Sequence, residues 1–202
     1  KYGKNLVGTF YQPDLVIIDP SILNSLPLKQ IRSGYAEIVK HALINDKKFY
    51  QWLKNNFQKL FLMKKSKLMY AISKSINIKA KYVNYDEKEN LITSSSRAML
   101  NFGHTFGHAL ETMNKFHSTL THGEAISIGM ILAAKISYKE KNILKSELDD
   151  LINHFKDAKL LYMVRGKMYP CETVDRDHDK NVSDHARNAC NLVNMRPLFL
   201  AV

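Results

Sequence analysis

The sequence is poor in cysteine, long apolar runs and acidic residues, and each shortage argues against a class of protein. Cys171 and Cys190 are the only cysteines in 202 residues. They are too few for a disulfide framework, so a reducing cytosol is the simplest setting and we expect a cytoplasmic protein. No stretch approaches the roughly 18 apolar residues that span a bilayer, so no membrane partner is expected. The first residues lack the apolar run of a signal peptide and do not begin with Met, which suggests a piece of a longer protein.

Basic residues outnumber acidic ones by 30 to 19, which gives a formal net charge of +11 at pH 7. Such an excess invites a nucleic-acid interpretation. The lysines, however, are scattered along amphipathic segments, as at Lys47-Lys48 and Lys64-Lys65, which is typical of a solvated surface. We therefore expect no nucleic-acid partner and favour a basic cleft for a small anionic substrate.

Hydrophobic periodicity predicts a mainly α fold with one strand near its start. The apolar run Leu15–Asp19 is rich in β-branched residues and predicts a strand, and Asp19-Pro20-Ser21 then predicts a turn and helix start. A polar loop is expected over residues 86–96, and the pattern decays beyond Leu161. The predicted helices are Leu28–Asn45, Lys47–Phe61, Lys64–Tyr85, Ala98–Met113, Gly123–Lys141 and Lys145–Leu161.

The most informative stretch contains three histidines. His104 and His108 are four residues apart on one predicted helical face, and His122 follows a short polar break. Neutral imidazole is the commonest metal ligand, and catalytic zinc typically takes three protein ligands. The candidate sets are the pair itself, one of the pair with His122, or either option with Glu111, which shares the face. Glu37, beside small residues, is a second carboxylate candidate, and a helical module whose histidines only pack is the non-catalytic alternative.

Five short blocks follow one another between residue 3 and about residue 140: 3–13 (Gly-Lys-Asn-Leu-Val-Gly-Thr-Phe-Tyr-Gln-Pro), 33–40 (Ser-Gly-Tyr-Ala-Glu-Ile-Val-Lys), 78–87 (Ile-Lys-Ala-Lys-Tyr-Val-Asn-Tyr-Asp-Glu), 97–109 (from Arg through Asn-Phe-Gly-His-Thr-Phe-Gly-His-Ala) and 122–125 (His-Gly-Glu-Ala). Each block alone is weak, but together and in this order they resemble the 3-dehydroquinate synthase family, within the sugar phosphate cyclases.

The resemblance implies a two-domain enzyme with an N-terminal Rossmann-like NAD domain and a C-terminal helical domain for metal and substrate. Residues 1–25 would be the tail of the NAD domain and a linker, and 26–202 the multi-helix metal- and substrate-binding domain, with 160–202 matching poorly. The strand near the start would then be a remnant of the α/β domain. The sequence contains no Gly-x-Gly-x-x-Gly turn, which fits the absence of the nucleotide-binding part.

The resemblance also assigns roles to individual residues. Glu37, His104 and His122 would hold zinc, or cobalt, and His108 would face the substrate phosphate as a proton-transfer or phosphate-binding group. The implied substrate contacts are Asn5, Lys40, Lys79, Arg97, Asn101 and Lys180. The positions implied to touch NAD are Lys4, Ile22, Leu23, Asn24 and Ser25.

The implied activity is that of an NAD- and metal-dependent lyase of the shikimate pathway, in aromatic amino acid biosynthesis. It converts 3-deoxy-D-arabino-heptulosonate 7-phosphate to 3-dehydroquinate and phosphate, as a homodimer in the full-length form. The 202-residue chain is expected to be inactive alone. The nearest alternatives are 2-deoxy-scyllo-inosose synthase, another cyclase, and the metal-dependent glycerol dehydrogenases. Lys79 and Arg97 together suit a carboxylate and favour dehydroquinate synthase, although the loop 84–96 before Arg97 is longer than usual in the family.

Overall fold

The computed structural model describes residues 11–91, 93, 95–113, 120–161, 163–164 and 167–168. Of the predicted site residues, Lys4, Asn5 and Lys180 lie outside this part of the chain. The elements, in order, are η1 (Pro20–Ser25), α1 (Leu28–Asn45), α2 (Lys47–Phe61), α3 (Lys65–Tyr85), η2 (Arg97–Asn101), α4 (His104–Met113), α5 (His122–Lys139), α6 (Lys145–Asp157), β1 (Met163–Val164) and β2 (Lys167–Met168). The last two pair as an antiparallel hairpin.

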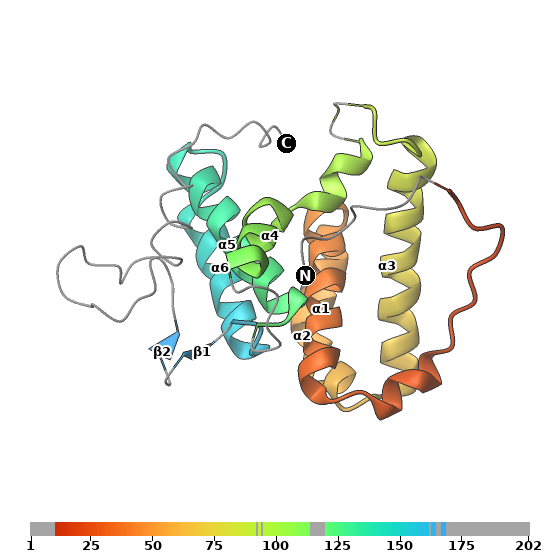
Figure 1. Cartoon of the computed structure of the whole chain (residues 1–202). Helices are drawn as coiled ribbons and strands as arrows, with labels where there is room; N and C mark the ends of the chain where they lie inside the picture. Colours follow the sequence, from red (N-terminus) through yellow and green to blue (C-terminus); the bar gives the residue numbers. More distant parts are fainter. Residues whose placement is uncertain are drawn as a thin grey trace.

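The helices form two groups that meet along α1 and α5 (Figure 1). Helices α2 and α3 pack against α1 and against each other, whereas α4 and α6 pack against α5. The shared core includes Tyr35 and Val39 of α1, Ile126 and Met130 of α5, and Phe155 of α6. The contact between α1 and α5 therefore joins the two groups. Residues at this contact are packed against helices of both groups.

Helix α5 is the most buried of the described helices. Its sequence is rich in Ile, Ala and Met around its whole circumference, a composition typical of a helix with protein on all sides. Thr121 caps its first turn through a reciprocal capping box with Glu124, in which Thr121 N donates to Glu124 Oε2 at 2.7 Å. The cap fixes the start of the helix at His122, one residue before the predicted start.

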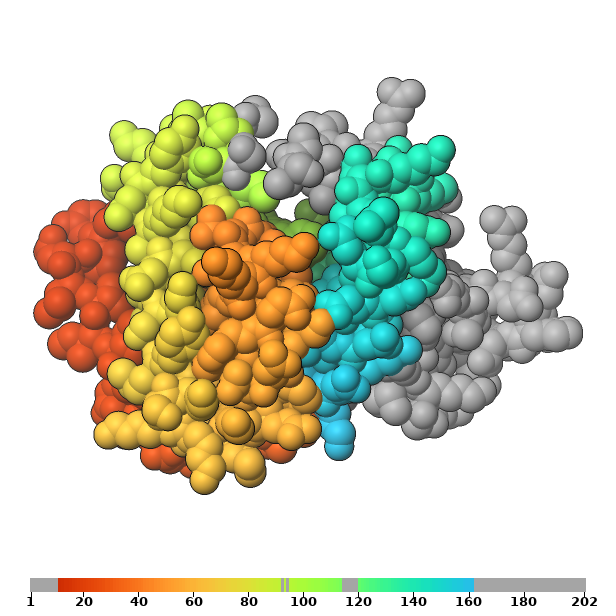
Figure 2. Space-filling model, turned by 180° about the vertical axis from the view of Figure 1, so that it is seen from behind, coloured from red at the N-terminus to blue at the C-terminus, as the bar shows by residue number. Residues whose placement is uncertain are grey.

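The predicted strand at Leu15–Asp19 is wrong, since no strand is formed there. Leu15, Val16 and Ile17 are 75%, 66% and 84% exposed, and the segment runs along the outer edge of the molecule (Figure 1, Figure 2). A β-branched run becomes a strand only when a neighbouring strand satisfies its backbone groups. Within the described residues, this segment has no such neighbour.

The single helix predicted over Ala98–Met113 is also wrong, because the chain breaks at Phe102 and Gly103 into η2 and α4. Gly103 has a φ of +78°, a conformation that L side chains rarely adopt. A Cβ at Gly103 would lie 2.6 Å from Met130 Cγ. The break follows from the close approach of α5, and it sets the direction in which α4 leaves with His104 at its first position.

Within the described part of the chain, none of the helices is long and apolar enough to cross a membrane.

Candidate metal centre

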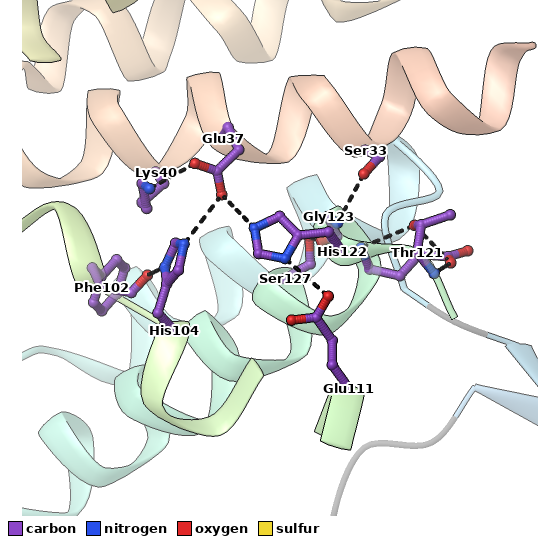
Figure 3. A network of polar contacts seen from close by, with 11 residues as sticks. Ser33, Glu37, Lys40, Phe102, His104, Glu111, Thr121, His122, Gly123 and Ser127 are labelled. Atoms are coloured by element: carbon purple, nitrogen blue, oxygen red, sulfur yellow. Dashed lines mark hydrogen bonds and ion pairs between the residues drawn. The ribbon is translucent and has the colours of Figure 1, made fainter. Parts of the chain in front are cut away.

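Three side chains from three helices converge where α1 meets the first turns of α4 and α5 (Figure 3). Glu37 Oε1 lies 3.8 Å from His104 Nε2 and 3.8 Å from His122 Nε2. The two imidazole centroids are 5.4 Å apart. These ligand atoms are close enough to one another to bind a single metal ion. The resemblance implied the same three residues.

The backbone at the start of α5 is held directly against α1. Gly123 N donates to Ser33 Oγ at 2.8 Å, and a Cβ at Gly123 would lie 2.3 Å from the Ser33 carbonyl oxygen. Ser33 and Glu37 are one turn apart on α1, so this contact brings His122 opposite Glu37. The glycine of the His-Gly-Glu-Ala block is thus needed for the close approach of the two helices.

The electrostatics of the cluster favour metal-binding protonation states. Burial raises the pKa of Glu37, but the Lys40 ammonium, 2.7 Å away, together with both histidines holds that pKa below its usual value. Burial, and then the charge of Lys40, lowers the pKa of His104 to about 4, so its ring is neutral at pH 7. A carboxylate and neutral imidazoles are the forms that bind a metal.

The donor set fits zinc. Two histidines and one glutamate form a recognised catalytic zinc set, which leaves a position for water or substrate. Glu37 Oε1 is buried, and no hydrogen bond to it is found among the described residues. A cation between Glu37 and the two Nε2 atoms would compensate this otherwise costly oxygen.

A second group, His108, Glu111 and His122, also has ligand atoms within reach of one another. Glu111 Oε1 lies 3.1 Å from His122 Nδ1, so Glu37 and Glu111 face opposite nitrogens of the His122 ring. His108 is exposed, with its ring centroid 5.1 Å from that of His104 and 6.1 Å from that of His122. The structure therefore brings all five candidate ligands of the sequence together in two overlapping sets.

A polar cavity of about 230 Å³ opens beside the Glu37 cluster. Four of the residues expected to contact substrate line it: Lys40, Lys79, Arg97 and Asn101. His41, Glu89 and Leu100 also line it and were not among the predicted site residues. The lining thus includes three cationic side chains and one amide, groups suited to carboxylate or phosphate oxygens, together with the carboxylates of Glu37 and Glu89.

Glu89 is the least expected member of this lining. Asn101 Nδ2 donates to Glu89 Oε1 at 2.8 Å, and Arg97 Nε lies 3.9 Å from Glu89 Oε2. A carboxylate thus contacts two of the groups expected to bind an anionic substrate. In the sequence, Glu89 stands out only because it follows the Asp-Glu pair of the third block by two residues. That spacing does not distinguish it from an ordinary solvated glutamate in a loop.

The long loop before Arg97 is organised by a buried carboxylate. Asp86 is 4% exposed and accepts hydrogen bonds from Asn90 N at 2.9 Å, Leu91 N at 3.4 Å and Arg97 N at 3.1 Å. Arg97 also donates to the Glu87 carbonyl oxygen at 2.8 Å. The loop therefore leaves Arg97 in the lining of the cavity.

Four of the five positions expected to touch NAD fall within the described chain, and they share one short element. Ile22, Leu23, Asn24 and Ser25 belong to η1, whose first turn is capped when Ser21 N donates to Asp19 Oδ1 at 2.9 Å. The Ile22 side chain is largely exposed. None of the four lines the cavity.

Comparisons with known proteins agree on one family. The model of the 3-dehydroquinate synthase C-terminal region matches residues 34–181, and that of the N-terminal region matches residues 1–33. The chain is 46% identical over 160 residues to the 3-dehydroquinate synthase of Pelagibacter ubique, covering 79% of the chain and 42% of the relative. It is 42% identical over 191 residues to that of Bartonella quintana, covering 92% and 49%. The chain thus spans less than half the length of these curated relatives.

Solved structures show the same architecture. A 2-deoxy-scyllo-inosose synthase complexed with carbaglucose-6-phosphate, NAD⁺ and Co²⁺ matches 96% of the chain and 48% of its own with a TM-score of 0.69 at 28% identity. A 2-epi-5-epi-valiolone synthase of Streptomyces hygroscopicus subsp. jinggangensis, with NAD⁺ and Zn²⁺ bound, covers 94% and 48% with a TM-score of 0.74 at 22% identity. The prediction of a mainly α domain of this fold is confirmed.

Proposed function

Because the chain belongs to the 3-dehydroquinate synthase family, we propose that it forms the metal- and substrate-binding part of a 3-dehydroquinate synthase. The reaction would convert 3-deoxy-D-arabino-heptulosonate 7-phosphate to 3-dehydroquinate and phosphate. The observation that carries the proposal is the convergence of Glu37, His104 and His122 beside a cavity whose lining includes Lys40, Lys79 and Arg97.

In this proposal Glu37, His104 and His122 hold zinc or cobalt at the edge of the cavity. When bound, the metal supplies Lewis acidity toward a substrate hydroxyl or carbonyl, and NAD⁺ supplies a hydride acceptor. Lys40 keeps Glu37 ionised through its 2.7 Å contact, and its own side chain is almost fully buried. Burial lowers the pKa of Lys40, while Glu37 opposes that shift. Lys40 therefore has two proposed roles: it keeps the Glu37 carboxylate charged, and it lines the cavity.

The remaining cavity residues would bind and orient the substrate. Arg97 presents a planar fork suited to a carboxylate or phosphate, and Lys79 adds a compact positive charge. Asn101 can donate to a hydroxyl or carboxyl oxygen. His108, exposed beside both other histidine rings, would hold or transfer a proton at the substrate phosphate.

We assign NAD binding to a second domain of the parent enzyme, separate from the helical domain. We place residues 1–25 with that domain and its linker, and assign Ile22 to Ser25 together with Lys4 to contacts with the dinucleotide. Asn5 and Lys180 stay proposed substrate contacts. The length of the curated relatives supports a two-domain parent, which we propose acts as a cytoplasmic homodimer.

A related cyclase activity is the second candidate. The similarity to 2-deoxy-scyllo-inosose synthase, whose solved structure holds a phosphorylated carbasugar analogue, supports it. The Lys79 and Arg97 side chains in one cavity favour the heptulosonate, because it carries a carboxylate as well as a phosphate.

Turnover in a full-length enzyme tests the proposal. The 202 residues would replace the matching part of the Pelagibacter ubique relative, and phosphate release would be followed with the heptulosonate phosphate and with glucose 6-phosphate. We expect turnover of the heptulosonate phosphate alone, and an increase in KM of at least tenfold for Arg97→Ala. The same chimera carrying His104→Ala provides the inactive control. Phosphate release from glucose 6-phosphate but not from the heptulosonate phosphate would contradict the proposal.

A further inference from the structure

The two ring nitrogens of His122 face two different carboxylates (Figure 3). Nε2 lies 3.8 Å from Glu37 Oε1, whereas Nδ1 lies 3.1 Å from Glu111 Oε1, which is hydrogen-bond distance. An ionised carboxylate only accepts hydrogen bonds, so the proton of this contact belongs to Nδ1. With the proton on Nδ1, Nε2 is the nitrogen that faces Glu37 and could bind a metal.

We propose that Glu111 is a positioning residue of the metal centre, which sets the orientation and tautomer of His122 without binding the metal itself. The inference rests on the proposed metal-binding function of Glu37, His104 and His122. A metal-bound histidine commonly donates its second N–H to a carboxylate or carbonyl, which orients the ring and makes it a stronger ligand.

The placement of Glu111 suits this role. It is 7% exposed and lies two turns after His104 on the same face of α4. Helix α4 packs closely along α5, the helix that carries His122 at its first position. One helix therefore supplies one proposed ligand directly and supports the second ligand from behind.

His104 shows the same plan with a weaker partner. Its Nε2 faces Glu37, and its Nδ1 lies 3.3 Å from the Phe102 carbonyl oxygen, just before the helix begins. Both rings thus direct Nε2 toward Glu37 and Nδ1 toward an oxygen acceptor. His122 alone of the two relies on a side chain for this, so its support can be removed by substitution.

The competing arrangement makes Glu111 a ligand, together with His108 and with Nδ1 of His122. Two observations favour the positioning role. Glu37 Oε1 lies 3.8 Å from both Nε2 atoms, too far for hydrogen bonds but suited to a shared cation, whereas Glu111 Oε1 lies at hydrogen-bond distance from Nδ1 of His122. His108, which the competing set requires, is exposed at the surface of α4.

Zinc titration of the 202-residue chain against a chromophoric chelator tests the role. We expect Glu111→Ala to weaken binding by about 10- to 100-fold, and Glu111→Gln by less because its amide oxygen still accepts from Nδ1. His122→Ala sets the scale for loss of a ligand. Glu124→Gln is the matched control, since it removes the charge of a glutamate two residues from His122 while glutamine can still close the capping box with Thr121; its affinity should stay within about threefold of the parent. Thermal unfolding without metal checks that each variant is folded.

The tautomer of His122, read from its ¹⁵N shifts, separates positioning from ligation. We expect Nδ1–H in the metal-free chain, loss of this preference in Glu111→Ala, and a zinc-induced shift at Nε2. A zinc-induced shift at Nδ1, or unchanged zinc affinity in both Glu111 variants, would overturn the inference. If the parent chain binds no zinc, the proposed function fails instead, while a His122 tautomer that does not respond to Glu111→Ala would overturn the positioning role independently.

Discussion

His154 is a buried histidine that belongs to neither group of candidate ligands and lies in the aromatic core between α1, α2 and α6. Its Nε2 lies 3.0 Å from the Tyr35 hydroxyl, and its ring meets those of Tyr50 and Phe57 at centroid distances of 5.7 and 5.6 Å. Burial, followed by the nearby Lys54 ammonium, lowers the pKa of His154 to about 4, although Asp150 and Asp157 oppose the shift. The ring is therefore neutral in the fold.

This burial predicts acid sensitivity at the scale of one residue. In the unfolded chain His154 titrates near its ordinary value of 6.5, above its folded value of about 4. The unfolded state binds the proton first, so the stabilisation is complete above about pH 6.5 and is lost as the pH falls toward 4. For His154 the loss at pH 4 is about 3 kcal/mol. Urea unfolding at a series of pH values from 4.5 to 7.5 measures the effect. The free energy of unfolding should change less steeply with pH in His154→Gln than in the parent.

Two parallel pH profiles would contradict this account. The slope should not vanish in the variant, because His41 is also buried and its pKa is likewise lowered to about 4, chiefly by burial and then by Lys40. His41 contacts Ser75 Oγ through Nδ1 at 2.6 Å, so its surroundings are independent of the His154 core.

At the scale of elements, the contact between α4 and α5 depends on the absence of a side chain at Gly129. A Cβ there would lie 2.0 Å from the Gly103 carbonyl oxygen, an overlap with backbone that no rotamer relieves. We expect Gly129→Ala to lower the free energy of unfolding by about 2–3 kcal/mol and to weaken zinc binding, because α4 must move with His104. Chemical denaturation and zinc titration of the same sample measure both effects.

Gly34→Ala is the control for this prediction. Gly34 lies inside α1, exposed, with nothing within 4 Å of the position a Cβ would take. Alanine is the better helix former by about 0.5–1 kcal/mol, so this variant should be slightly more stable than the parent. A Gly129→Ala variant that is as stable as Gly34→Ala would show that the helices tolerate the extra methyl group.

The same contacts explain which elements could be predicted from the sequence. Helices α1 and α2 match the predicted bounds because their periodicity is local and their ends coincide with Asn45, Asp46 and the turn after Phe61. The break at Gly103 was missed, because glycine is tolerated in helices. The positive φ of Gly103 is imposed by the close approach of α5, which lies later in the chain. Tertiary contact, not local preference, decided that boundary.

The candidate site shows the same division between local and tertiary information. The spacing of His104 and His108 predicts a shared face, and the rings do lie side by side. Spacing cannot rank them, because both reach His122, and it cannot bring in Glu37 from a distant helix. From the residues alone Glu37 was one carboxylate candidate beside Glu111; the resemblance singled it out as a ligand, and its role and that of its partners stay predictions.

At the scale of the whole molecule, the apolar segment Leu15–Asp19 at the start of the described chain exposes side chains that are usually buried. Leu15 to Ile17 are largely exposed at one edge, next to η1 with its exposed Ile22 (Figure 2). The N-terminal family model matches this part of the chain, up to residue 33. We infer that an α/β domain covers these side chains in the parent enzyme and supplies the neighbouring strand that Leu15–Asp19 lacks in this structure.

If the metal centre and the dinucleotide site belong to different domains, zinc binding and turnover should be separable. Glu37, His104 and His122 all lie on α1, α4 and α5, so the 202-residue chain alone should bind one zinc ion tightly. Hydride transfer needs a dinucleotide site, for which the sequence offers no glycine-rich turn, so the same chain should show no turnover with NAD⁺ and the heptulosonate phosphate. Calorimetric zinc titration and a phosphate-release assay on one preparation measure the two properties.

Adding the separately expressed NAD-binding part of a relative makes the prediction sharper. Its strands would pair with Leu15–Asp19, so mixing should restore some turnover and should reduce the exposure of this segment to proteolysis. A charged substitution there, Ile17→Lys, should abolish restoration while leaving zinc affinity within about twofold, because Ile17 is 84% exposed and remote in the chain from the three proposed ligands. Turnover by the chain alone, or a parallel loss of zinc binding in Ile17→Lys, would mean that the metal centre and the dinucleotide site are not divided between two folding units.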